Sequence, residues 1–231
     1  MIRFQNISAL FYKQFKDTLK NLPVLVLFLV YPCIAFVMTQ AMKDAPGTES
    51  LFISMFATMH CVFTPMVSIA STLSEEKESN TLRVLIMSNV NLKEYFMSIG
   101  GFILIADLIT GFCFLPLSRY SLIQSLQFLI ALSIGCLISI VLGICIGLYA
   151  KNASAANGLA VPIGMVFAFL PMLSNFNKGI ENISRFTYGQ QISYLLTGEK
   201  LSLFAFIILI INTMLLVLLS ALLFKKSLSE D

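Results

Sequence analysis

Long apolar stretches separated by short charged segments dominate the pattern along the chain. Six windows carry at most one charge inside them, and each can hold a helix of about 20 residues, the length that crosses a bilayer. The predicted spans lie near residues 23–41, 51–73, 96–117, 125–149, 158–174 and 202–224. The pattern therefore predicts an all-α integral membrane protein, with residues 1–231 forming a single transmembrane domain of six crossing helices.

Two further segments are partly apolar and flank the spans. Over residues 1–22, apolar side chains recur every three or four positions with basic residues between them, which predicts an amphipathic helix in the inner interface. The alternative for this segment is the ordinary basic flank of a first span. Residues 175–200 alternate aromatic and polar side chains, which favours short helices at the outer interface over a plain exposed loop and leaves re-entry into the membrane open.

Composition and charge placement agree with a membrane protein. Hydrophobic residues make up 58% of the 231 positions and charged residues 12%, whereas soluble domains are about half apolar and a quarter charged. The net charge of +3 is too small to indicate a nucleic-acid partner. Ten of the fifteen Lys and Arg residues lie before the first span or after the second, fourth and sixth spans. The positive-inside rule then predicts that both termini are cytoplasmic.

Several kinds of catalytic and metal chemistry lack their residues in this sequence. A GxxxxGK[ST] phosphate loop is absent, so ATP-driven work would need a partner subunit. A single histidine excludes paired-histidine metal motifs, and five cysteines inside apolar runs form no metal-binding spacing. The pair Glu75-Glu76 is similar to that of intramembrane prenyl-protein proteases, but Asn80 stands where their arginine is required. We therefore expect no enzyme activity, no metal and no cofactor on this chain.

The segment over residues 74–90 carries the most specific pattern in the chain. It predicts a charged helix end, a break at Ser79-Asn80, Thr81 as an N-cap, and a short helix after it. The residues expected on one apolar face of this short helix are Leu82, Leu85 and Ile86. A short helix with an apolar face just below the membrane is typical of a docking element, and the alternative is a solvated loop with a charge cluster.

This segment resembles the run after the second span in membrane subunits of ABC-2 type exporters, E-[KR]-E-x-G-T-L-x-x-L-x-x-x-P-[VI]. The matching residues are Glu76-Lys77-Glu78, Thr81-Leu82, Leu85 and Val90. Asn80 replaces the glycine of that run, and asparagine also tolerates a left-handed backbone; Asn89 replaces the proline. Two other positions join the resemblance, Pro171 at the end of the fifth span and Phe186-Thr187-Tyr188 in the outer segment.

The resemblance implies a permease subunit that forms the translocation pathway as a homodimer or heterodimer and docks on a separate ABC ATP-binding subunit. ATP and Mg would bind to that partner. The residues implied in coupling are Glu75, Glu76, Glu78, Thr81, Leu82, Leu85 and Ile86. The substrate would be a drug, an antimicrobial or amphipathic peptide, or a lipid-like molecule. The expected location is the cytoplasmic membrane of a bacterial cell.

Three polar residues inside the predicted spans form the second candidate site. His60, Asp107 and Asn212 fall at similar depths, and a carboxylate at the bilayer centre costs about 2.5–3.5 kcal/mol, so Asp107 needs a partner. We expect His60 or Asn212 to hold Asp107, either as part of a pathway or as a structural contact between helices. If His60 and Asp107 relay ions, the chain could be an ATP-independent channel or secondary transporter. A membrane immunity or assembly protein is a further alternative.

Overall fold

A computed structural model describes residues 3–42, 48–88, 90–118, 120–199 and 202–230, with the side chains at 48–49 and 226–230 left out. Asn89, one of the departures from the exporter motif, lies outside this description. The described chain contains no strand. The helices in chain order are α1 (Phe4–Lys20), α2 (Leu22–Ala41), α3 (Thr48–Glu78), α4 (Thr81–Met87), α5 (Leu92–Gly111) with the 3₁₀ turn η1 (Phe112–Leu117), α6 (Leu122–Tyr149), α7 (Ala153–Ser174), α8 (Lys178–Ser184), α9 (Tyr188–Leu196) and α10 (Leu203–Glu230).

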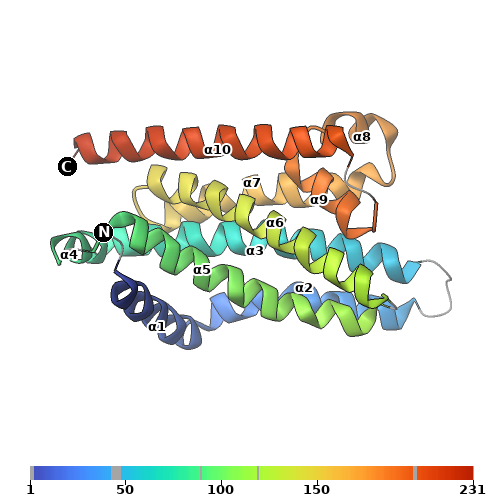
Figure 1. Cartoon of the computed structure of the whole chain (residues 1–231), viewed down its shortest axis with the longest axis horizontal. Coiled ribbons are helices and arrows are strands. Elements are labelled where there is room, and N and C mark those ends of the chain that lie inside the picture. The colour runs from blue at the N-terminus through green and yellow to red at the C-terminus, as the bar shows by residue number, and fades with distance from the viewer. Residues whose placement is uncertain (1–2, 43–47, 89, 119, 200–201, 231) are drawn as a thin grey trace.

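Six of these helices are long and apolar enough to cross a membrane, counted over the described residues. They are α2, α3, α5 with η1, α6, α7 and α10, and they coincide with the six predicted windows. The protein is therefore an all-α, multi-pass membrane protein, as the hydropathy pattern predicted. Figure 1 shows the spans running along one long axis, with the beginning of α1, the short helix α4 and the end of α10 gathered at one end. We call this the α4 end and the opposite one the α8 end.

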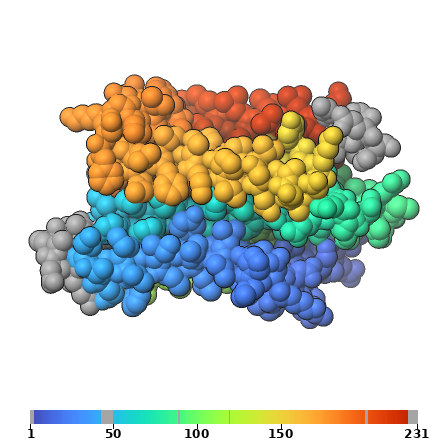
Figure 2. All heavy atoms as spheres, turned by 180° about the vertical axis from the view of Figure 1, so that it is seen from behind, coloured from blue at the N-terminus to red at the C-terminus, as the bar shows by residue number. Residues whose placement is uncertain are grey.

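Helix α3 lies at the centre of the bundle and packs most closely against α6. It also contacts α2, α5, α7 and α9, and Figure 2 shows it between α2 and α7 on the rear face. Glycine permits the α3–α6 contact: a Cβ atom at Gly143 would overlap Ile69 and the Met66 carbonyl oxygen, and one at Gly147 would lie 2.9 Å from Leu73 Cδ2. The Gly143–Gly147 motif therefore packs two helices of the same chain.

The amphipathic N-terminal helix is present as α1, and its polar contacts fix it to the start of α5. The Arg3 backbone N donates to Glu94 Oε1 at 2.6 Å, and Asn6 Nδ2 donates to Glu94 Oε2 at 2.8 Å. Ser98 Oγ donates to the Ile7 carbonyl oxygen at 3.0 Å. This segment is thus a helix packed on the bundle rather than a basic flank of the first span.

The segment between the last two spans forms α8 and α9, and α9 is inserted into the bundle. Helix α9 contacts α3, α6, α7 and α10, and Tyr188 at its start is fully buried. The Tyr188 ring stacks on Phe167 with centroids 5.2 Å apart, and its hydroxyl lies 3.1 Å from Ser139 Oγ. Thr187 caps this helix, because its side chain accepts from the Gln190 backbone N. The prediction of short helices in this segment is confirmed, and α9 packs among the spans instead of forming an exposed loop. Their location on the outer side of the membrane stays a prediction.

Several spans begin a few residues before the predicted windows because local capping determines where they start. At α5, Asn91 accepts from the Lys93 backbone N at 3.1 Å, while Glu94 accepts from the Asn91 backbone N at 3.1 Å. At α6, Ser121 and Gln124 form the same kind of reciprocal pair. Glu94, a charged residue just before the predicted third window, therefore lies inside the first turn of α5.

Candidate functional site

Helix α3 continues past the predicted end of its span and turns sharply into α4 at the α4 end. Asn80 makes the turn with a left-handed backbone, φ 57° and ψ 10°, and its carbonyl oxygen accepts from the Val84 backbone N at 3.2 Å. Thr81 is the first residue of α4, so the expectation that it would be the N-cap is wrong; Asn80 has that position. The Thr81 hydroxyl instead lies 2.8 Å from Ser79 Oγ. The break falls at the predicted Ser79-Asn80 pair.

The faces of α4 are arranged differently from the sequence-based expectation. Leu82 and Leu85 are half-buried and pack against the chain's own apolar cluster, which includes Tyr95 and Ile99 of α5. Ile86 is 43% exposed. Val84 and Met87, which were not among the residues expected on the apolar face, are 59% and 78% exposed. The two leucines therefore hold α4 on the bundle, and Val84, Ile86 and Met87 form its free apolar surface.

The charged run at the end of α3 connects this helix to three others. Glu76 is buried and pairs with Lys13 of α1, with Oε1 and Nζ 2.5 Å apart. Lys77 Nζ donates to the carbonyl oxygens of Leu148 and Ala150, both at 2.8 Å, at the end of α6. Glu78 Oε2 accepts from the Ala153 backbone N at 3.1 Å, at the start of α7. Charge placement follows the helix dipoles, with a cation at a C-terminus and an anion at an N-terminus.

Glu75 differs from its two neighbouring glutamates. Its side chain is exposed, and its Oε1 accepts only a local bond from Ser71 Oγ at 2.9 Å among the described contacts. Of the three glutamates selected for coupling, Glu76 and Glu78 thus have structural partners in the chain. Glu75 is the one whose described hydrogen bond stays within α3.

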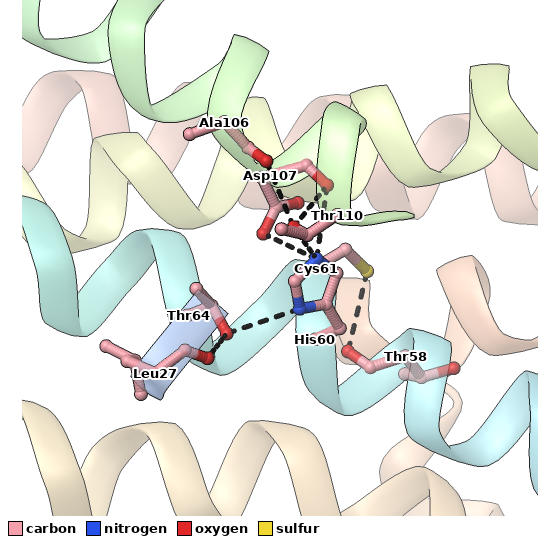
Figure 3. A network of polar contacts seen from close by, with 8 residues as sticks. All are labelled: Leu27, Thr58, His60, Cys61, Thr64, Ala106, Asp107 and Thr110. Atoms are coloured by element: carbon pink, nitrogen blue, oxygen red, sulfur yellow. Dashed lines mark hydrogen bonds and ion pairs between the residues drawn. The ribbon is translucent and has the colours of Figure 1, made fainter. Parts of the chain in front are cut away.

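His60 and Asp107 meet at a buried point between α3 and α5 (Figure 3). Both side chains are completely buried, and His60 Nε2 lies 3.2 Å from Asp107 Oδ1 and 3.1 Å from the Asp107 carbonyl oxygen. Thr110 Oγ1 lies 3.0 Å from the same nitrogen. The Thr110 hydroxyl hydrogen has other acceptors, the Ala106 and Asp107 carbonyl oxygens. Nε2 therefore faces three acceptor oxygens and carries a hydrogen.

The opposite side of the imidazole connects this cluster to α2. Thr64 Oγ1 lies 3.5 Å from His60 Nδ1 and donates to the Leu27 carbonyl oxygen at 3.2 Å. Rings of Tyr31 and Phe114 pack around the imidazole, with centroids 6.4 and 5.7 Å away. The cluster thus joins three spans, and the side chains of His60 and Asp107 are fully shielded from the surface of the bundle.

The Asp107 carboxylate retains unused hydrogen-bonding capacity. Neither oxygen has a hydrogen bond of good geometry from the described residues, although His60 Nε2 is within ion-pair distance. No group of three or more metal-binding side chains occurs in the described ranges. A buried carboxyl beside an imidazole can exchange a proton or hold helices together, and burial makes any unpaired charge costly.

Asn212 does not join this cluster. Its amide nitrogen donates to the Phe186 carbonyl oxygen at 3.1 Å and to the Ile208 carbonyl oxygen at 2.9 Å. Asn212 therefore links α10 to the segment between α8 and α9. Of the two partners expected for Asp107, the structure places His60 beside it and Asn212 elsewhere.

Sequence reasoning missed the buried polar residues of α9. Gln190 and Gln191 are almost fully buried, and Gln191 Nε2 donates to the Arg185 carbonyl oxygen at 2.5 Å. Gly189 lies so close to the Phe167 carbonyl oxygen that an added Cβ would be 2.6 Å away. The glycine after Tyr188 was the available signal for this close approach.

Comparisons with known proteins give no family assignment for the chain. No protein-family model matches the sequence, and a search of curated proteins finds no significant match. The fold alone assigns the chain to the multi-pass, all-α membrane proteins.

Proposed function

We propose that the chain is the permease subunit of an ABC-2 type exporter, driven by a separate ATP-binding subunit. The observation that carries the proposal is α4, a short helix with free apolar side chains at the end of the most central span. Leu82 and Leu85 fix α4 to the bundle, while Val84, Ile86 and Met87 are free to contact a partner.

The connections of α3 suggest how docking would be coupled to the pathway. A force applied to α4 passes through Asn80 into α3, and Glu76, Lys77 and Glu78 link the same helix end to α1, α6 and α7. Because packed helices transmit displacement as rigid elements, ATP-driven movement of the partner would shift several spans together. In this proposal the charged run distributes the motion within the permease, and apolar contacts bind the ATP-binding subunit.

A paired substitution on α4 tests the docking surface. The double variant Val84→Asp/Met87→Asp in an epitope-tagged chain, expressed in its native host, should reduce by tenfold or more the co-purification of a protein photolabelled by 8-azido-ATP. The reason is that burying an apolar side chain of this size contributes about 1.5–3 kcal/mol. Leu85 is unsuitable for this test because it belongs to the chain's own core.

The matched control is Ile183→Asp on α8, where the side chain is 70% exposed at the opposite end. This variant should retain the photolabelled partner at the wild-type level. Failure of the wild-type chain to retain any azido-ATP-labelled protein, or equal retention by the α4 variant, would refute the exporter proposal.

The orientation of the chain is part of the same proposal. The α4 end should be cytoplasmic, so in a cysteine-free background Asn182→Cys should react with a membrane-impermeant maleimide in intact cells. Ser88→Cys, exposed at the α4 end, should react only after permeabilisation. The reverse pattern would place α4 on the side without ATP and contradict the docking assignment.

The contact between His60 and Asp107 favours one second candidate, an ion-coupled transporter that works without ATP. The observation that supports this candidate is the pairing of two titratable side chains inside the predicted membrane spans. Purified chain in liposomes would then carry protons down a pH gradient, measured with an enclosed pyranine dye, and Asp107→Asn would abolish the signal. The exporter proposal expects no proton flux above that of protein-free liposomes.

A further inference from the structure

A groove on the bundle surface lies between α1, α2 and α5, and its walls are apolar. Its volume is about 350 Å³. Each helix contributes long apolar side chains, among them Phe15 and Leu19 of α1, Leu25 and Leu29 of α2, and Phe102 and Ile109 of α5. Thr110, the hydroxyl beside His60, lies at the inner limit of this lining. The groove therefore runs from the interfacial helix toward the middle of the membrane.

The way α1 is attached explains why the groove stays open. The hydrogen bonds from α1 to α5 involve its first turns, and Phe11 packs edge-on against Phe102 with centroids 5.4 Å apart. Phe15 also meets Phe102 edge-on, with centroids 6.5 Å apart, but Phe15 and Leu19 are still 47% and 56% exposed. The second half of α1 bonds instead to α3, through Lys13 and Glu76. The space between its second half, α2 and α5 is thus left unfilled by the described chain.

The position of the groove in the membrane restricts what can fill it. Its walls belong to two membrane spans and to an amphipathic helix, so it opens into the hydrocarbon region close to the interface. Water gains nothing from such a surface, and an empty space would forfeit the dispersion contacts of every lining atom. A hydrocarbon chain avoids both costs, because it needs no hydrogen bonds and makes dispersion contacts with the lining atoms.

Charge beside the groove identifies the kind of molecule that carries this hydrocarbon chain. Lys16 and Lys20 are exposed, stand one position after Phe15 and Leu19, and lie one helical turn apart. Neither lysine has an ion pair within the described part of the chain. Basic side chains at this depth attract lipid phosphate, with anionic lipids favoured.

We propose that the α1–α2–α5 groove binds one acyl chain of an anionic phospholipid from the leaflet at the α4 end, with its phosphate against Lys16 and Lys20. The bound chain supports the second half of α1 on its groove side, and through the Lys13–Glu76 pair it supports the end of α3 that carries α4. The site depends only on the membrane fold, so it stands independently of the exporter assignment.

Photolabelling of the purified full chain tests the site. The protein is reconstituted in phosphatidylcholine vesicles containing phosphatidylglycerol with a diazirine on one acyl chain, and labelled peptides are mapped by mass spectrometry. Peptides of α1, α2 and α5 should be labelled more strongly than those of α10, whose surface is also exposed but contributes no residue to the groove. Ala106→Phe, which fills the groove from α5, should lower their labelling to the level of α10.

The matched control is Ala221→Phe, the same change at an exposed position of α10, which should leave the pattern unchanged. If Ala106→Phe does not fold, Ile109→Trp serves, since Ile109 is a 63% exposed groove residue. Lys16→Gln and Lys20→Gln should each reduce the preference for phosphatidylglycerol over phosphatidylcholine by roughly fivefold. Even labelling of all spans, labelling unaffected by filling the groove, or groove peptides protected by a second protein copy would overturn the proposal.

Discussion

Helices α6 and α10 are each 28 residues long and equally apolar, yet they occupy opposite environments. Most of the apolar stretch of α6 is buried, whereas only 11% of that of α10 is buried. The difference lies in small residues. Helix α6 places Gly135, Gly143 and Gly147 against neighbouring elements, while α10 contains no glycine. Lipid tails are as apolar as leucine, so hydropathy does not decide which span is central, and close backbone approach does.

Polar residues act in the same direction as glycine. Helix α3 is the least apolar of the six spans and the most buried, because its polar side chains find partners within the bundle. His60 meets Asp107 of α5, and Lys77 meets the end of α6. In a membrane the interior of the protein is the place where such groups can be satisfied.

The strongest test of this comparison adds volume at the α3–α6 contact. Gly143→Leu should destabilise the fold by more than about 3 kcal/mol, the upper part of the range for overpacking, because Ile69 and the Met66 backbone already occupy the space. The measurement is the thermal midpoint and the monodisperse yield in detergent. Ala221→Leu on the exposed surface of α10 is the control and should change neither. Equal behaviour of the two variants would show that glycine packing does not separate these helices.

Removing the polar partner of α3 should have the next largest effect. Asp107→Leu leaves Nε2–H of His60 with one acceptor fewer in a buried site and should cost about 1–3 kcal/mol of unfolding free energy. Asp107→Asn keeps a polar oxygen and should be mild. A double-mutant cycle with His60→Leu measures the coupling, and additive losses would mean that the two side chains do not interact.

The cap on the end of α6 provides a smaller test. Lys77→Met removes a cation that donates to carbonyl oxygens of the last turn of α6, and a loss of about 1–2 kcal/mol is expected. Lys77→Arg should recover part of the stability. Lys151→Met, at an exposed lysine at the same end, should remain near wild type. A Lys151 effect as large as that of Lys77 would indicate general charge loss instead of capping.

The smallest effect is expected on α10. Asn212→Leu removes a bond to the Phe186 carbonyl oxygen, and interhelical hydrogen bonds of this type average about 0.6 kcal/mol. Thr213→Val, which loses only a bond to Leu209 within the helix, is the reference. A loss at Asn212 as large as that at Asp107 would show that α10 is held as firmly as the central spans.

Local features of the fold could be predicted because they depend on residues close together in the sequence. The six spans, the amphipathic helix α1 and the break at Ser79-Asn80 follow from hydropathy, periodicity and turn chemistry. The capping pairs Asn91–Glu94 and Ser121–Gln124 were equally readable, and using them would have placed the starts of α5 and α6 correctly.

The candidate sites were less predictable, since their residues depend on which surfaces meet. Matched depth selected His60, Asp107 and Asn212 together, but depth leaves the rotation and the neighbours of each helix undetermined. Periodicity grouped Leu82, Leu85 and Ile86, and the bundle covers the first two. Which residues of α4 remain free was set by the packing of Leu82 and Leu85 against the apolar cluster of the bundle.

The sequence by itself determined that this protein folds in a lipid bilayer, how many helices cross it, and where helices begin and turn. Each of these depends on the transfer free energy of a segment or on hydrogen bonds within a few residues. Only the tertiary structure decided that α3 is central, that Asp107 is held by His60, and that Glu76, Lys77 and Glu78 connect three different helices. Those contacts join residues far apart in the chain, and they form only where glycine and polar side chains bring particular helix faces together.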